Sequence, residues 1–246
     1  MSAPRFYCDL PLLPGETVSL PPAVVRHAAQ VLRCREGETL TLFNGHGAEY
    51  EALLVSVSRS AMTARIVAAH RPERESPLNI HLLQSLQGSD KMDFTFQKAV
   101  ELGVVALHPL STRRSLLKLS GERAERRCQH WAGVVIAACE QCGRNWVPPV
   151  HDLESLPNYL AKPGRVGAQR LLLAPGAKTV LRDLPMAREV DVLVGPEGGL
   201  EAGEIELAQQ AGFTPIQLGP RILRTETAGL AVVAALQTLW GDWGGR

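Results

Sequence analysis

Two stretches near the C-terminus constrain the fold most, because each changes from a strand pattern to a helix pattern across a Gly-Pro pair. In the first, the apolar, β-branched run 190–194 ends at the pair 195–196, and a helical pattern follows. In the second, the run 216–218 ends at the pair 219–220, and a helical pattern follows again. Strand, loop and helix in this order predict two adjacent strand ends, which is where open α/β sheets bind ligands.

The first of these loops is poorly suited to phosphate. Phosphate-binding loops present N–H groups and positive charge at a helix start, whereas Glu197, Glu201 and Glu204 place carboxylates there. The string also matches neither the G-x-G-x-x-G dinucleotide pattern nor the P-loop pattern. A ligand without phosphate, with an adenine edge for backbone groups to read and a cationic centre, fits better. S-adenosylmethionine has these properties.

The two loops also resemble a known family. The string LVGPEGGL at 193–200, followed by LGPRILRTETA at 218–228, resembles the ribosomal RNA small subunit methyltransferase E family, within the SPOUT superfamily. The ordered resemblance covers nearly the whole chain, and its other parts are HAAQVLR (27–33), KAVELGV (98–104), PLSTRRS (109–115) and EQCGR (140–144).

Residues 1–72 form the first predicted domain, a small β-barrel with one embedded helix. Its strand candidates are 39–43, 50–57 and 61–69, and a hairpin turn is predicted at 44–47. The embedded helix is the run 23–33, whose apolar positions have helical spacing. The resemblance implies that this domain is a PUA-like domain that recognises RNA.

Residues 73–246 form the second predicted domain, and the boundary falls within a charged, proline-bounded linker at 71–77. Strand and helix patterns alternate from residue 78 onward, which predicts an α/β fold with a mostly parallel sheet covered by helices. The last helical run, 226–240, is apolar nearly all round, so we expect burial on more than one side, with cover from a second subunit. The resemblance implies a SPOUT fold with a C-terminal trefoil knot, and a homodimer.

Composition restricts the partners and the compartment. The net charge of +1 disfavours tight non-specific binding of RNA and keeps an enzyme for small molecules open. No apolar run could cross a bilayer and the N-terminus has no signal-peptide core, so we expect a cytoplasmic protein. The five cysteines lack metal-binding spacing, so no metal is expected, and the lone C-x-x-C of Cys139 and Cys142 favours small buried side chains.

Two matched loops favour a cofactor site over two ordinary turns. The resemblance implies that the cofactor is S-adenosylmethionine. The residues that we expect to contact it, many through backbone atoms, are Leu173, Leu193, Val194, Gly195, Pro196, Gly198, Gly199, Leu218, Gly219, Arg221, Ile222, Leu223, Arg224, Thr227 and Ala228.

The resemblance implies methylation of a uridine at N3 in small-subunit ribosomal RNA. This imide nitrogen must lose its proton before it can attack a sulfonium methyl, so the enzyme needs a base or cations that stabilise the developing anion. Glu197 and Glu226 are candidates for the base, although an acid at position 226 also suits a helix start for structural reasons alone. Candidates for the cationic role are Arg224, Arg221, Arg113 and Arg114.

Without the family resemblance, the remaining basic residues would be read as ordinary surface charges. The resemblance implies that the candidates for contact with RNA are Arg5, Arg26, His27, Arg33, Lys91, Arg113 and Arg114. Two alternatives remain. One is a SPOUT enzyme that methylates a ribose hydroxyl or a tRNA base, and the other is a non-catalytic RNA-binding or assembly module.

Overall fold

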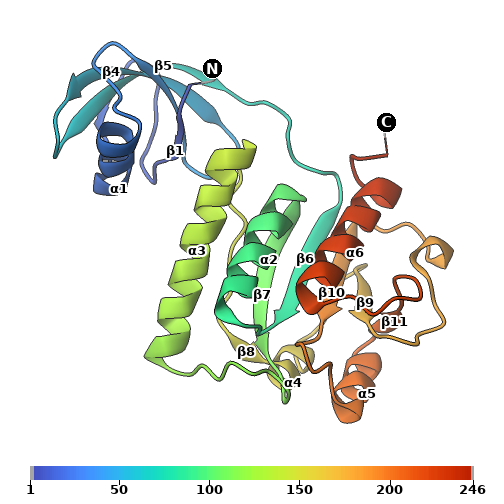
Figure 1. Ribbon diagram of the computed structural model, residues 1–246. Helices are drawn as coiled ribbons and strands as arrows, with labels where there is room; N and C mark the ends of the chain where they lie inside the picture. Colours follow the sequence, from blue (N-terminus) through green and yellow to red (C-terminus); the bar gives the residue numbers. More distant parts are fainter. Residues whose placement is uncertain (1–2, 245–246) are drawn as a thin grey trace. The chain divides into compact units, whose positions relative to one another are not determined.

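The computed structural model describes residues 3–244, apart from the side chain of Ser89. Its contacts divide the chain into two compact units (Figure 1). The first runs to Glu75 and includes Cys139–Val147, and the second comprises Ser76–Ala138 and the chain from Pro148 onward. By its contacts the segment Cys139–Val147 thus belongs to the first unit, whereas the sequence-based division assigned it to the second domain. A backbone N–H of Tyr7 that donates to Glu140 Oε1, at 2.9 Å, helps to hold it in the first unit.

The first unit contains one five-stranded sheet, in the order β1-β3-β4-β5-β2. β1 pairs with β3 in parallel and the other pairings are antiparallel. No pairing between β1 and β2 closes the sheet within the described residues, so the predicted barrel is an open sheet. The strands are β1 (Arg5–Tyr7), β2 (Thr17–Ser19), β3 (Thr39–Phe43), β4 (Glu49–Val57) and β5 (Met62–His70).

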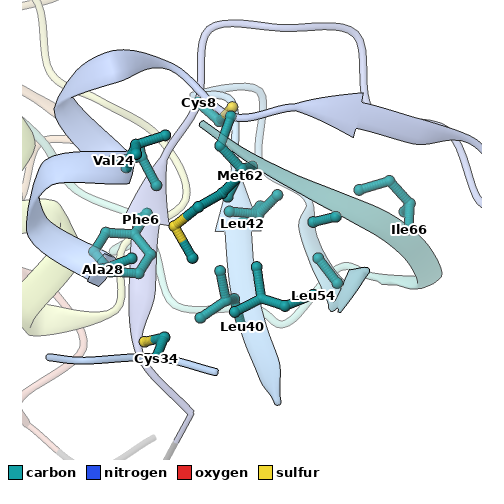
Figure 2. Close-up of a cluster of buried hydrophobic side chains, with 14 of the residues drawn as sticks. Phe6, Cys8, Val24, Ala28, Cys34, Leu40, Leu42, Leu54, Met62 and Ile66 are labelled. Atoms are coloured by element: carbon teal, nitrogen blue, oxygen red, sulfur yellow. The ribbon is translucent and has the colours of Figure 1, made fainter. Parts of the chain in front are cut away.

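A short helical segment packs on this sheet. It begins as α1 (Pro22–Val25) and continues as the π-helix η1 (Arg26–Val31). Figure 2 shows Val24 and Ala28 of this segment beside Phe6 and Met62 of the sheet, and all four side chains are buried. The buried residues Val24 and Ala28 of the helical segment are four positions apart, and the buried residues of β5 alternate with more exposed ones. These spacings are the side-chain periods of a helix and of a strand.

The second unit contains a six-stranded sheet in the order β11-β9-β10-β6-β7-β8, in which every pairing is parallel. The predicted mostly parallel α/β architecture is therefore confirmed. The strands are β6 (Asn79–Ser85), β7 (Val104–Ser111), β8 (Glu154–Ser155), β9 (Gln169–Leu173), β10 (Glu189–Val194) and β11 (Thr214–Ile216). The helices are α2 (Ser89–Glu101), α3 (Glu122–Cys142), α4 (Leu156–Leu160), the 3-10 helix η2 (Leu181–Asp183), α5 (Ala202–Gln210) and α6 (Thr225–Trp240), and the end of α3 from Cys139 onward belongs to the first unit.

Helices cover both faces of this sheet. On one face, α6 contacts β6, β10 and α2, and Figure 1 shows α2 and α6 side by side. On the other face, Leu83 and Leu193 pack with residues of α4 and α5. Burial on both faces explains why β10 is a nearly continuous apolar run. None of the described helices combines the length and the apolar character needed to cross a membrane.

Candidate functional site

The loops after β9, β10 and β11 meet at the carboxyl edge of the parallel sheet. The sequence predicted that the strand ends of β10 and β11 lie next to each other, but β9 lies between them and pairs with both. This corrects the expected strand order and adds a third loop, 174–176, to the site. Parallel strands all point their carboxyl ends the same way, so loops distant in sequence converge there.

Glycines set the backbone course of the two loops that the sequence singled out. Gly199 has φ +69° and Gly219 has φ +70°, in the left-handed region that side chains with a Cβ rarely adopt. A Cβ at either position would meet no atom within 4 Å, so the requirement for glycine is conformational and not one of space. Each loop therefore depends on one glycine for its shape.

A buried hydrogen-bond chain connects the two loops. Thr225 Oγ1 donates to the carbonyl oxygen of Gly195 at 2.5 Å, and Gln84 Nε2 donates to Thr225 Oγ1 at 3.3 Å. Thr225 is the first residue of α6, and the N-cap residue before it, Arg224, makes no side-chain cap. Neither Gln84 nor Thr225 was predicted from the sequence as a site residue, and the available signal was a glutamine inside the apolar strand β6.

The three loops enclose a cavity of about 690 Å³. Its wall combines the Gly-Pro turns with apolar side chains such as Leu173, Ile216 and Leu218. The backbone N–H groups of Gly219 and Leu223 donate no hydrogen bond within residues 3–244, so these donors remain for a ligand. The cavity is thus largely apolar, with backbone polar groups at its rim.

Most of the predicted cofactor-binding residues line this cavity. Those that do are Leu173, Val194, Gly195, Pro196, Gly198, Gly199, Leu218, Gly219, Arg221, Ile222, Leu223, Arg224 and Ala228. Leu193 and Thr227 do not, because the Leu193 side chain is buried in the core on the α4 and α5 face and Thr227 is exposed. Alternation along β10 explains the first case, since Val194 and Leu193 point to opposite faces.

Three charged side chains from different elements lie together in the cavity wall. Lys91 Nζ, from α2, lies 3.6 Å from Glu197 Oε1 and 3.5 Å from Glu226 Oε1. Arg221 and Arg224 also line the cavity and form no ion pair within the described residues. The structure therefore brings together three of the four predicted catalytic residues, Arg224, Glu226 and Glu197, and adds Lys91 to them.

The fourth predicted catalytic residue, Arg113, lies outside the cavity wall. Its side chain is 77% exposed and 3.7 Å from Glu201, while its backbone N–H donates to the buried carboxylate of Glu204 at 2.9 Å. The neighbouring Arg114 donates from Nη1 to the carbonyl oxygen of Gly198 at 3.1 Å. This arginine pair thus ties the loop after β7 to the loop after β10.

The remaining predicted RNA contacts belong to the first unit. Arg26, His27 and Arg33 are exposed on or next to η1. Arg5 differs, because its guanidinium donates to Glu49 and to the carbonyl oxygen of Arg144, and its side chain is only 12% exposed. The contacts of Arg5 are therefore internal to the unit.

Comparison with known proteins gives matches over both units. A model of the RNA methyltransferase domain matches residues 74–237, and a model of the RNA methyltransferase PUA domain matches residues 20–67. The ribosomal RNA small subunit methyltransferase E of Buchnera aphidicola (subspecies Schizaphis graminum) is 34% identical over 240 residues, 97% of each chain. The Bacillus subtilis protein of the same name is 31% identical and 89% of each chain is covered.

Two solved structures are also similar over nearly the full chain. The ribosomal RNA small subunit methyltransferase E of Neisseria gonorrhoeae, bound to S-adenosylmethionine, has 43% identity and a TM-score of 0.92, with 98% of this chain and 100% of that chain covered. The Legionella pneumophila protein Lpg2936, in complex with the bound cofactor S-adenosylmethionine, has 37% identity and a TM-score of 0.94 at the same coverage.

Proposed function

Because this chain belongs to the ribosomal RNA small subunit methyltransferase E family, we propose that it transfers a methyl group from S-adenosylmethionine to N3 of a uridine in small-subunit ribosomal RNA. The observation that carries the proposal is the cavity formed by the loops after β9, β10 and β11. The two similar structures solved with this cofactor support the assignment of the ligand.

The cavity residues fit the chemical groups of S-adenosylmethionine. The volume and the apolar wall of the cavity suit an adenosine. The N–H groups of Gly219 and Leu223, which donate no hydrogen bond within the described residues, suit the acceptors on an adenine edge. The carboxylates of Glu197 and Glu226 suit a ligand that carries a positive sulfonium. When bound, this cofactor supplies the electrophilic methyl group.

The protein's own part in the reaction is to orient the uridine and remove its N3 proton. Arg221 and Arg224 are free of ion pairs among the described residues, so either can stabilise negative charge as it develops on the imide. Glu197 and Glu226 are the carboxylates near enough to this wall to accept the proton.

We propose that residues 1–72 recognise the RNA and that residues 73–246 carry out methyl transfer. Arg26, His27 and Arg33 are the contacts offered by the first region, since all three are exposed. Arg113 and Arg114 offer phosphate contacts in the second.

Three further proposals concern the assembly, the chain path and the cellular location. A homodimer would cover the apolar side chains that α2 and the C-terminal part of the chain leave exposed, namely Phe94, Leu239 and Trp243. A C-terminal trefoil knot is proposed from the family resemblance alone. We place the protein in the cytoplasm, where ribosomal subunits assemble.

The test is a methylation assay on small subunits that lack the modification, with mass mapping of the product nucleoside. N3-methyluridine is the expected product. A ribose-methylated product, or methylation of tRNA, would instead assign a different specificity within the same superfamily. Absence of S-adenosylmethionine binding in calorimetry would support a non-catalytic RNA-binding module.

A further inference from the structure

The two carboxylates beside Lys91 are not equivalent. Glu197 Oε1 lies 3.6 Å from Lys91 Nζ and also accepts a hydrogen bond of 3.3 Å from the backbone N–H of Gly88, the N-cap residue of α2. A carboxylate at a helix N-terminus is stabilised by the helix dipole. The contacts of Glu197 therefore anchor the loop after β10 to the start of α2.

Glu226 is held at only one of its two oxygens. Oε1 lies 3.5 Å from Lys91 Nζ, whereas Oε2 is buried and has no hydrogen-bond partner within the described residues. A buried carboxylate oxygen without a donor is costly, and such atoms in native structures call for a physical reason. A donor on a bound ligand is such a reason, because the Glu226 side chain lines the cavity and a rotation of its carboxylate turns this shielded oxygen toward the ligand.

We propose that Glu226 Oε2 accepts the N3 proton of the uridine, and that Lys91 is the positioning residue that holds Glu226 for this step through Oε1. This assignment rests on the proposed function and decides between its two candidate acids. In the step, the N3–H proton moves to Oε2 and the nitrogen lone pair forms the new bond to the methyl carbon. The electron pair of the broken methyl–sulfur bond stays on sulfur.

This role differs from the contact with RNA for which the sequence made Lys91 a candidate. A lysine that only binds phosphate acts independently of Glu226, and its loss raises the KM for RNA. A lysine that positions Glu226 acts through that carboxylate, so its loss lowers kcat and has no further effect once the carboxylate is gone. The two roles therefore predict different results in a double-mutant cycle.

The experiment uses the full chain, with initial rates of N3-methyluridine formation on small subunits for four variants, one control variant and the wild type. We expect Glu226→Gln to lower kcat about 100-fold or more, in the range of a lost general base. Lys91→Met should lower kcat about tenfold with KM for RNA changed less than about threefold, and Lys91→Arg should restore most of the rate. Lys91→Met combined with Glu226→Gln should be no slower than Glu226→Gln alone.

Lys98→Met is the matched control. Lys98 lies on the same helix, its side chain is 35% exposed like that of Lys91, and its partner is Glu101 at 2.7 Å, outside the cavity. We expect no change in kcat. Calorimetry with S-adenosylmethionine and thermal melting provide readouts that do not depend on turnover, and the variants that change only Lys91 or Lys98 should keep the wild-type Kd within about threefold.

Three results would overturn the inference. These are a wild-type rate for Glu226→Gln, additive losses in the double variant, and a Lys91→Met effect confined to the KM for RNA. Failure of the proposed function looks different, because the wild type would then form no N3-methyluridine or bind no S-adenosylmethionine.

Discussion

Thr225 Oγ1 donates a 2.5 Å hydrogen bond to the carbonyl oxygen of Gly195, and this contact joins the loop after β10 to the start of α6. The two residues are 30 positions apart in the chain. Since both residues line the cavity, one hydroxyl group links two parts of its wall.

Replacing Thr225 with Val should therefore lower the affinity of the cavity for S-adenosylmethionine without changing the cavity volume much. The Gly195 carbonyl loses its donor, and an unsatisfied polar group of this kind costs about 1–3 kcal/mol. We expect the Kd for S-adenosylmethionine in calorimetry to rise by about tenfold. Thr225→Ser keeps the hydroxyl and should bind like the wild type, and equal losses in both variants would rule out the hydrogen bond as the cause.

Gly199→Ala should destabilise the first loop through its backbone alone. At φ +69° an alanine is strained by about 1–2 kcal/mol, although its Cβ would touch nothing within 4 Å. Gly203→Ala is the control, because Gly203 lies in α5 with equal space and without a positive φ. Urea unfolding should show a loss for the first variant and no loss, or a gain of about 0.5–1 kcal/mol, for the second. The reverse order would contradict the conformational explanation.

The stability of the second unit should fall in acid because of His108. Burial, followed by the charges of His151 and Arg165, lowers the pKa of His108 to about 3, and its ring stacks on that of His151 at 4.1 Å. The folded state thus keeps His108 neutral while the unfolded state gains a proton below pH ~6.5, so the stability is present above that pH and is lost as the pH falls.

Urea unfolding between pH 7 and pH 4 measures this effect. His108 alone should reduce the free energy of unfolding by up to about 1.4 kcal/mol per pH unit below pH ~6.5. His108→Phe, which cannot titrate, should make the pH dependence shallower in this window. An unchanged slope would show that other groups cause the acid sensitivity.

Asp191→Asn should be among the more destabilising single changes in the sheet. Asp191 is 1% exposed on β10, accepts hydrogen bonds from Arg165 and lies 3.3 Å from Arg170 Nε. Loss of its charge leaves the two arginines without their buried partner, at a cost of about 3–5 kcal/mol. Asp183→Asn is the exposed control, because Asp183 and its partner Arg182 are both exposed, and its effect should stay below about 1 kcal/mol. Thermal melting compares the two, and equal shifts would contradict the prediction.

Several short elements and the order of the strands could not be predicted from the sequence. The strands β1, β2 and β8 have three residues or fewer, too few to show a side-chain period, and α4 has five residues. The chain continues from α1 into a π-helix of only six residues, a segment too short for its wider turn to show in the pattern, so the pattern predicted one helix. The position of β9 between β10 and β11 depends on how the whole sheet packs.

The sequence predicted those parts of the candidate site whose backbone conformation depends on a few neighbouring residues. Glycines at 199 and 219 mark the loops because only a residue without Cβ adopts their φ easily. The contacts of Lys91 with Glu197 and Glu226 were not predicted, since they join three elements that are far apart in the chain.

By itself, the sequence determined the apolar strands, the amphipathic helices and the two turns, because a side chain's direction follows from backbone geometry over a few residues. Only the tertiary structure decided which loops meet, that residues 139–147 join the first unit, and which carboxylate keeps an unpaired oxygen. These features depend on packing between distant segments, and the energy of that packing is not encoded in any local pattern.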